Sequence, residues 1–221
     1  MKICRDFYLE KLIKRKNNGL IKVITGIRRC GKSYLLNNLF YHHLLESGVK
    51  EDHIIRFAFD SAEDLYLIGE SLVQLEKEKR GVDPEKFMAY IRSKINDDQM
   101  YYLLLDEIQM MDCFEAVLNG YMRKDNMDVF VTGSNAKLLS KDIATEFAGR
   151  GDEVHMYPLS FAEFMTVYQG DKYMGLSEYM LYGGIPMVVL REEAEEKAAT
   201  LQNLISEIYI RDIVNRNRVR N

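Results

Sequence analysis

The segment "GIRRCGKS", Gly26 to Ser33, combines two glycines, a lysine and a serine at a spacing that suits phosphate binding. Gly26 and Gly31 let the backbone wrap so that consecutive N–H groups point toward phosphate oxygens. Lys32 supplies a positive charge for the β- and γ-phosphates, and the Ser33 hydroxyl can complete a Mg²⁺ shell. The pattern therefore predicts a site for Mg²⁺ and the phosphates of a nucleotide.

The elements on either side of this loop distinguish it from an accidental glycine turn. "LIKVIT" (Leu20 to Thr25) is short, apolar and β-branched, which predicts a strand directly before the loop. "SYLLNNLFYHHLLESG" predicts a helix behind it, with Gly48 as its stop. The helix adds the positive end of its dipole to the loop. The predicted nucleotide-binding residues are Gly26, Ile27, Arg28, Arg29, Cys30, Gly31, Lys32, Ser33 and Tyr34.

Three of these loop residues leave a choice of roles. Arg28 and Arg29 are either phosphate contacts or solvated loop charges. Cys30 could make the loop sensitive to oxidation, but a spacer at a variable position is the favoured interpretation.

"YYLLLDE" supplies the acidic residues that a phosphate loop needs next. The apolar run predicts a buried strand, which would place Asp106 at the carboxyl edge of the sheet, beside the loop. Asp106 is then expected to bind Mg²⁺ through water, and Glu107 to act as general base on an attacking water. A kinase must exclude water and does not need this carboxylate, so the pair favours a hydrolase over a kinase. An ordinary acidic turn after a core strand is the alternative, which the phosphate loop makes the less favoured one.

A further strand candidate, "HIIRFAFD" (His53 to Asp60), lies between Lys32 and Asp106 along the chain. The strand that ends in Asp106 is therefore third in sequence. We expect it to lie beside the first strand in space, in the arrangement where an extra strand is inserted between the two motif strands. That arrangement is typical of water-activating P-loop ATPases.

Two later segments could complete a hydrolytic site. In "VFVTGSN", Ser134 or Asn135, and less readily Thr132, could orient the attacking water, although an ordinary strand-to-helix turn explains them equally well. In "FAGRGDE", Arg150 could stabilise γ-phosphate charge, normally from a neighbouring subunit. A surface arginine in a glycine turn is the alternative.

Strands that alternate with helices predict an α/β fold, with a five-stranded parallel sheet covered by helices on both faces. An amphipathic helix over Asp6 to Arg15 precedes it, and Asp152 to Pro158 is the weakest strand candidate. After Pro158 the strand signal fades, and "SFAE" has the form of a capping box that starts a helix. We therefore expect a P-loop core with the N-terminal helix over 1–158. A small helical lid and the start of a C-terminal extension are expected over 159–221.

Composition indicates an ordinary globular protein. The chain has 221 residues, 47% of them hydrophobic, and a net charge of −4, which argues against a general nucleic-acid coat but not against a local basic patch. Its three cysteines are far apart, which favours a reducing compartment. The charged N-terminus does not suit a signal peptide, and no apolar run approaches about 20 residues. These features predict a cytoplasmic protein with no membrane contact.

Taken together, the motifs resemble those of the AAA+ superfamily of P-loop ATPases. More closely, the chain resembles prokaryotic ATP-binding proteins that carry an AAA domain followed by a C-terminal domain of unknown function. The resemblance rests on "VITGIRRCGKSYLL", "YYLLLDEIQ", "VFVTGSNAKLLS", "FAGRGDEVHMYPLSFAEF", "YGGIPMVV" and "EIYIRDIV". It implies a core with a helical lid, ATP and Mg²⁺ as ligands, and nucleotide-dependent switching. It also implies Ser134 or Asn135 as the sensor and Arg150 as a finger or sensor.

The resemblance leaves two functions open. The chain is either an ATPase that converts ATP to ADP and phosphate, or a nucleotide-gated binding module with little turnover. Similar proteins continue beyond "YIRDIV" into a further domain, which implies that this chain lacks it. A binding module could act on nucleic acid through that domain. Glu107 favours the ATPase. We also expect a homo-oligomer as one state of the protein. The sequence does not identify the client protein or nucleic acid.

Overall fold

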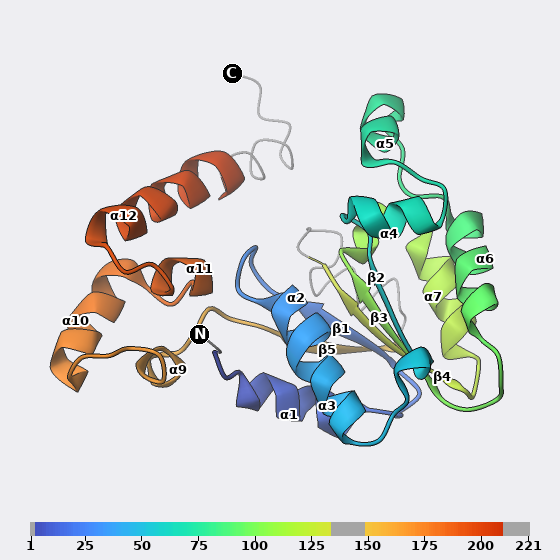
Figure 1. The fold of residues 1–221 in the computed structure, drawn as a ribbon, viewed down its shortest axis with the longest axis horizontal. Coiled ribbons are helices and arrows are strands. Elements are labelled where there is room, and N and C mark those ends of the chain that lie inside the picture. The colour runs from blue at the N-terminus through green and yellow to red at the C-terminus, as the bar shows by residue number, and fades with distance from the viewer. Residues whose placement is uncertain (1–2, 134–148, 210–221) are drawn as a thin grey trace. The chain divides into compact units, whose positions relative to one another are not determined.

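The computed structural model describes residues 3–133 and 149–209, which form two compact units (Figure 1). The first, here called the core unit, comprises Asp6–Gly26 and Lys32–Met156. The second, the helical unit, comprises Met1–Arg5, Ile27–Gly31 and Tyr157–Asn221. Each unit is described by itself below.

The core unit is built on a parallel sheet of five described strands (Figure 1). They are β1 (Ile21–Thr25), β2 (Ile54–Ala58), β3 (Tyr101–Asp106), β4 (Met127–Thr132) and β5 (Gly151–His155). Their order across the sheet is β2-β3-β4-β1-β5. The predicted five-stranded parallel α/β sheet is confirmed.

The expectation that the Asp106 strand lies beside the first strand is wrong. β4 lies between β3 and β1 and pairs with both of them. The reason is burial: β4 is buried along its whole length, which suits an interior position, whereas β2 exposes Arg56 and takes the edge. The predicted arrangement with an extra strand between the two motif strands is confirmed, and that strand is β4.

Side chains of the strands alternate between two helical layers. On one face Val23, Leu103 and Val131 join a buried cluster to which α4–α7 also contribute. On the other face Phe130 packs against Phe40, with ring centroids 4.4 Å apart. In Figure 1, α6 and α7 lie on one side of the sheet and α1–α3 on the other. Burial on both faces explains the continuous apolar runs of the sequence.

The helices of the core unit include two that the sequence predicted, α1 and the helix after the phosphate loop, the second with one difference. Their bounds are α1 (Asp6–Arg15), α2 (Lys32–Tyr34), α3 (Tyr41–Glu46), α4 (Ala62–Leu67), α5 (Leu72–Glu78), α6 (Pro84–Lys94) and α7 (Phe114–Met122). Short 3₁₀ turns cover Glu51–His53 and Ile108–Met110. The helix predicted after the loop contains a π-helical segment, Leu35–Phe40, between α2 and α3. Such segments often occur at functional sites.

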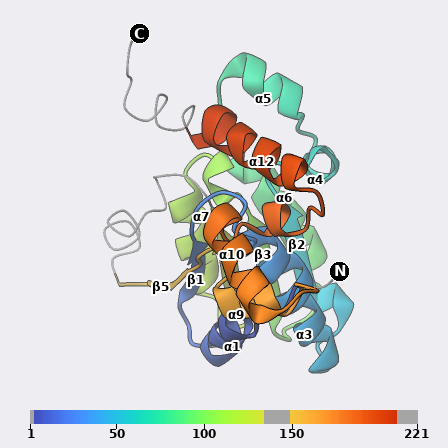
Figure 2. The same ribbon diagram turned by 90° about the vertical axis from the view of Figure 1, so that its left-hand side faces the viewer.

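The helical unit contains α9 (Phe161–Met165), α10 (Lys172–Tyr182), α11 (Pro186–Val189) and α12 (Ala194–Asn203) (Figure 2). A π-helical segment, Leu204–Tyr209, follows. The capping box predicted at "SFAE" is confirmed, because the Ser160 and Glu163 side chains each accept a hydrogen bond from the other residue's backbone N–H. Position 184 requires glycine, because any side chain there would collide with the carbonyl oxygen of Leu159.

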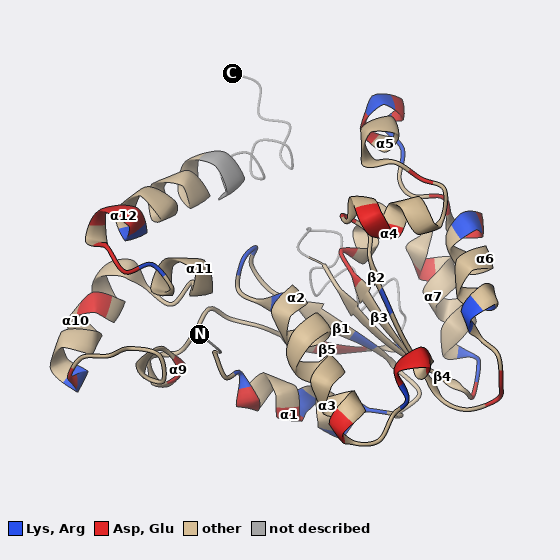
Figure 3. Ribbon diagram, in the orientation of Figure 1, with Lys and Arg blue, Asp and Glu red and all other residues tan. Residues whose placement is uncertain are grey.

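Charged residues follow the helix dipoles in several elements (Figure 3). α12 begins with Glu195 and Glu196, and α6 ends with Arg92 and Lys94. Acidic groups stabilise the amino end of a helix and basic groups the carboxyl end. Among the described helices, none combines the length and the apolar character that crossing a bilayer would require.

One ion pair lies inside the core unit at the amino-terminal end of the sheet. The Lys22 ammonium on β1 donates to the Asp128 carboxylate on β4, and both residues are buried. Burial lowers the pKa of Lys22, an effect that Asp128 opposes. Asp128 also accepts the backbone N–H of Asn17 at 2.8 Å. The pair therefore joins two central strands and the turn before β1.

We expect Asp128→Ala to lower the free energy of unfolding by about 3–5 kcal/mol, because it leaves the buried Lys22 ammonium without its carboxylate. Urea unfolding followed by circular dichroism measures this loss. The control is Asp152→Ala, which breaks a partly exposed pair with Arg15 at 2.7 Å and should cost about 1 kcal/mol or less. Equal losses in the two variants would contradict the prediction.

Candidate nucleotide-binding site

The predicted phosphate loop connects β1 to α2. Gly26 has φ 140° and Gly31 has φ 101°, backbone conformations that favour glycine. Lys32 is 5% exposed, and its Nζ donates to the carbonyl oxygen of Gly26 at 3.0 Å. The ammonium is thus held across the start of its own loop, close to the backbone that would surround a phosphate.

The tip of the loop, Ile27–Gly31, belongs to the helical unit. Cys30 is buried, and its carbonyl oxygen accepts a hydrogen bond from Arg5 Nη1 at 3.4 Å. Arg29 is exposed, and its Nη1 contacts Met187 Sδ at 3.3 Å. The tip is therefore anchored by side chains that lie outside the motif.

Asp106 ends β3 and is buried at the carboxyl edge of the sheet. It accepts hydrogen bonds from Thr132 Oγ1, from Ser33 and from Asn37 Nδ2, the last at 3.2 Å. Burial raises the pKa of Asp106, the bonds from Thr132 and Ser33 lower it, and the charges of Glu107 and Asp60 raise it further, so that the net direction is upward. The structure therefore brings Ser33 and Asp106 together.

This hydroxyl–carboxylate pair fits Mg²⁺. The ion prefers oxygen ligands and is usually held by one or two protein groups together with phosphate oxygens and water. In the described part of the chain, no group of three His, Cys, Asp or Glu residues forms an all-protein metal cage. A Mg²⁺ ion at Ser33 and Asp106 would take its other ligands from a nucleotide and from water.

Glu107 follows Asp106 in a left-handed conformation, with φ 51° and ψ 46°. Its N–H donates to Thr132 Oγ1 at 3.2 Å, and its carboxylate accepts from Gln109 Nε2. Asp60 follows β2 at the same sheet edge, because the N–H of Phe59 donates to the carbonyl oxygen of Asp106 at 3.0 Å. Desolvation, followed by the charge of Glu107, raises the pKa of Asp60.

Three predicted catalytic residues remain: Ser134, Asn135 and Arg150. Ser134 and Asn135 fall outside the described residues. Arg150 is exposed, its Nη1 donates to Asn119 at 3.4 Å, and its carbonyl oxygen accepts the N–H of Ile21. It therefore lies at the amino edge of the sheet, separated from the phosphate loop by the length of β1, roughly 16 Å. It does not join the site of its own chain.

Three residues near the site were not singled out from the sequence: Asn37, Asp60 and Gln109. Asn37 comes four residues after Ser33, a spacing that places both on one helix face and could have indicated it. Asp60 ends a strand candidate, as Asp106 does. Gln109 belongs to the short turn after Glu107 and carries no such spacing signal.

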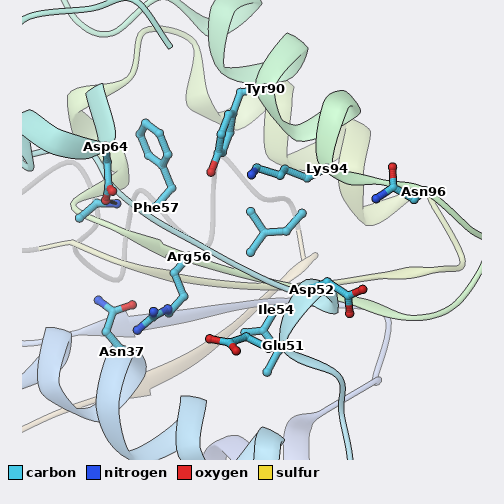
Figure 4. A pocket seen from close by; sticks show the side chains of 12 residues that line it. Asn37, Glu51, Asp52, Ile54, Arg56, Phe57, Asp64, Tyr90, Lys94 and Asn96 are labelled. Atoms are coloured by element: carbon cyan, nitrogen blue, oxygen red, sulfur yellow. Dashed lines mark hydrogen bonds between the residues drawn. The ribbon is translucent and has the colours of Figure 1, made fainter. Parts of the chain in front are cut away.

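A groove of about 640 Å³ runs along the outer edge of β2 in the core unit (Figure 4). Arg56 and Phe57 of β2, Tyr90 and Lys94 of α6, and Asn37 contribute to its lining. Figure 4 shows the side chains of Asn37 and Arg56 next to each other. Since Asn37 also contacts Asp106, this residue connects the groove with the acidic edge of the sheet.

We expect Asp106→Asn to raise the thermal unfolding temperature. The fold favours the protonated carboxyl, so the stability that this group contributes is present below its unfolded pKa, roughly 3.9. That stability is lost as pH rises through the raised folded pKa. The uncharged amide avoids the loss, so its advantage grows with pH over that range.

Melting curves at pH 4 and pH 7 test this expectation, with a gain of about 2–4 °C for each kcal/mol. The exposed Asp125→Asn is the matched control. If Asp106→Asn melted below the wild type at pH 7, the inference that the fold disfavours the ionised Asp106 would be wrong.

Comparisons with known proteins agree with the fold and with the motifs. A family model described as an AAA domain matches residues 18–165, more than half of the chain. An uncharacterised protein of Haemophilus influenzae is 35% identical over 220 residues, which cover 97% of this chain and 51% of that protein. An uncharacterised protein of Methanocaldococcus jannaschii is 31% identical over 231 residues, covering 99% and 46% respectively.

The protein therefore belongs to the AAA-domain family of P-loop proteins. The chain spans about half the length of the curated relatives named here. Among solved structures, a Walker-type ATPase of Pyrococcus abyssi matches with a TM-score of 0.57 and 19% identity, over 98% of this chain and 76% of that one. This likeness shows a shared fold.

Proposed function

We propose that the chain binds Mg²⁺ and ATP and hydrolyses ATP to ADP and phosphate to drive a conformational switch. One observation carries the proposal. The buried Asp106 carboxylate accepts a hydrogen bond from Ser33 of the phosphate loop, and Glu107 follows it at the same sheet edge. A binding loop, a cation site and a candidate base thus lie together.

Each group has a distinct role in this proposal. Loop N–H groups and Lys32 bind the phosphates, and Ser33 and Asp106 hold Mg²⁺. Mg²⁺ when bound would supply positive charge that offsets the charge of the β- and γ-phosphate oxygens. Lys32 Nζ lies 3.0 Å from the carbonyl oxygen of Gly26, so its ammonium is held at the loop that would bind the phosphates.

In this proposal, the Glu107 carboxylate contacts the water that attacks the γ-phosphate. Water adds to the γ-phosphorus while its proton passes to the Glu107 carboxylate, and the bond from the γ-phosphorus to the bridging oxygen of the β-phosphate breaks. ADP leaves with that oxygen. The hydrogen bond from the Glu107 N–H to Thr132 Oγ1 fixes the backbone that carries this base.

The other parts of the proposal concern the later segments. Ser134 or Asn135 would sense the γ-phosphate, and residues 159–221 would act as the lid. Arg150 lies at the far edge of its own sheet, so we assign it to the site of a neighbouring copy in a homo-oligomer. An always-ionised side chain with two forked donors suits the developing phosphate charge.

A nucleotide-gated binding module with little turnover is the second candidate. The observation that favours it is the hydrogen bond from Gln109 to Glu107, because a carboxylate that already accepts this bond is less available as a base. In this alternative the same loop holds ATP for long periods, and a partner protein or nucleic acid responds to the bound state.

We expect Lys32→Ala to abolish ATP binding, because the variant lacks the charge that faces the β- and γ-phosphates. Isothermal titration calorimetry with Mg²⁺ and ATP measures the change. The exposed Lys50→Ala is the matched control and should bind as the wild type does. If Lys32→Ala kept the wild-type affinity, the phosphate-loop assignment would be removed.

Glu107→Gln separates the two candidates. If Glu107 is the base, steady-state phosphate release should fall by about 10²–10⁴-fold while ATP affinity is retained. The exposed Glu85→Gln serves as control and should release phosphate at the wild-type rate. Equal, slow release from wild type and Glu107→Gln, with tight ATP binding in both, would reject hydrolysis and favour the binding module.

A further inference from the structure

Arg5 is a buried arginine that contacts three parts of the helical unit. It is 2% exposed. Its Nη1 donates to the carbonyl oxygen of Cys30 at 3.4 Å and its Nη2 to that of Tyr157 at 2.6 Å. Its Nε lies 3.0 Å from Glu163 Oε1. A buried charge is unfavourable unless it is paired and hydrogen-bonded, so these contacts fix the guanidinium in place.

The contact with Cys30 determines where the next amide points. A trans peptide directs its C=O and its N–H to opposite sides, and the described residues contain no cis peptide bond. Because the Cys30 carbonyl faces Arg5, the Gly31 N–H is directed away from Arg5. Gly31 belongs to the loop whose N–H groups would bind phosphate. Arg5 therefore orients one of the predicted phosphate donors.

The contact with Glu163 extends this connection to α9. One carboxylate oxygen of Glu163 faces Arg5, and the other accepts hydrogen bonds from Ser160 N at 2.8 Å and Ser160 Oγ at 2.9 Å. The first of these bonds, together with the Glu163 N–H that donates to Ser160 Oγ at 3.3 Å, forms the capping box that starts α9. A continuous set of polar contacts thus runs from the loop tip through Arg5 to the first turn of α9.

We propose that Arg5 is a positioning residue that presents the Gly31 N–H to the nucleotide phosphates and transmits occupancy of the loop to α9. The proposal rests on the nucleotide binding proposed above. A phosphate bound by the Gly31 N–H pulls on the peptide that carries the Cys30 carbonyl, and so acts on the hydrogen bond of that carbonyl with Arg5. Glu163 carries that shift to the helix start. Every residue of this connection lies in the helical unit.

The first experiment measures ATP affinity by calorimetry for Arg5→Met, which replaces the guanidinium with an unbranched apolar side chain. We expect the Kd to rise at least tenfold, because the loop loses the group that orients its amide. Arg15→Met is the matched control, since Arg15 pairs with Asp152 at 2.7 Å in the core unit, and it should bind within twofold of the wild type. Arg5→Lys keeps the charge without the forked donors and should lie between.

The second experiment follows hydrogen exchange of the α9 amides at saturating Mg²⁺ and ATP. The wild type and Arg15→Met should change their α9 protection on binding, whereas Arg5→Met should not, even when its site is filled. Glu163→Gln can still accept the bonds of Ser160 but lacks the charge that faces Arg5. It should bind ATP within about threefold of the wild type and lose the α9 response. A residue that only stabilised the fold would leave that response intact.

Circular dichroism identifies which variants are folded. If Arg5→Met does not fold, Arg5→Lys and Glu163→Gln carry the test. Wild-type affinity together with a wild-type α9 response in the folded Arg5 variants would overturn the role of Arg5 and leave nucleotide binding intact. Absence of ATP binding in the wild type and in Arg15→Met would instead overturn the proposed function and, with it, the premise of this connection. The two failures are therefore distinct.

Discussion

The candidate site depends on one hydroxyl group, that of Thr132 at the end of β4. It donates to the Asp106 carboxylate and accepts the N–H of Glu107. The same atom therefore stabilises a buried charge on β3 and fixes the left-handed turn that follows. This is possible only because β4 lies beside β3, so the strand order and the chemistry of the site are two consequences of one arrangement.

The type and position of several helices and strands could be predicted from the sequence, but the order of the strands in the sheet could not. Long apolar runs identified β3 and β4, and the capping box identified the start of α9, because these signals are local. Strand neighbours depend on which strands are buried on both faces. The arginine in "HIIRFAFD" does not by itself mark an edge strand, because Lys22 of "LIKVIT" is also charged and is buried in the sheet.

Some residues of the candidate site could likewise be predicted from the sequence, and others could not. Lys32, Ser33 and Asp106 are recognisable because phosphate and Mg²⁺ chemistry requires those residue types at a fixed place beside a strand. Asn37 and Asp60 reach the acidic edge through a helix face and a neighbouring strand. Arg5 lies in an unremarkable charged segment before α1, and only the folded chain places it behind the loop.

The acidic edge of the sheet carries carboxyl groups whose ionised form the fold disfavours and a bound cation would favour. Burial raises the pKa of Asp106, and the charges of Glu107 and Asp60 raise it further. A divalent cation would reverse this balance, because it favours the ionised carboxylates and offsets their mutual repulsion. Cation binding at this edge would therefore change the stability of the β3 and β2 ends, whereas phosphate binding would act on the loop tip that Arg5 holds. Under the proposed function, Mg²⁺ would act on the strand ends and the phosphates on the loop tip, and Ser33 of the same loop would contact the ion.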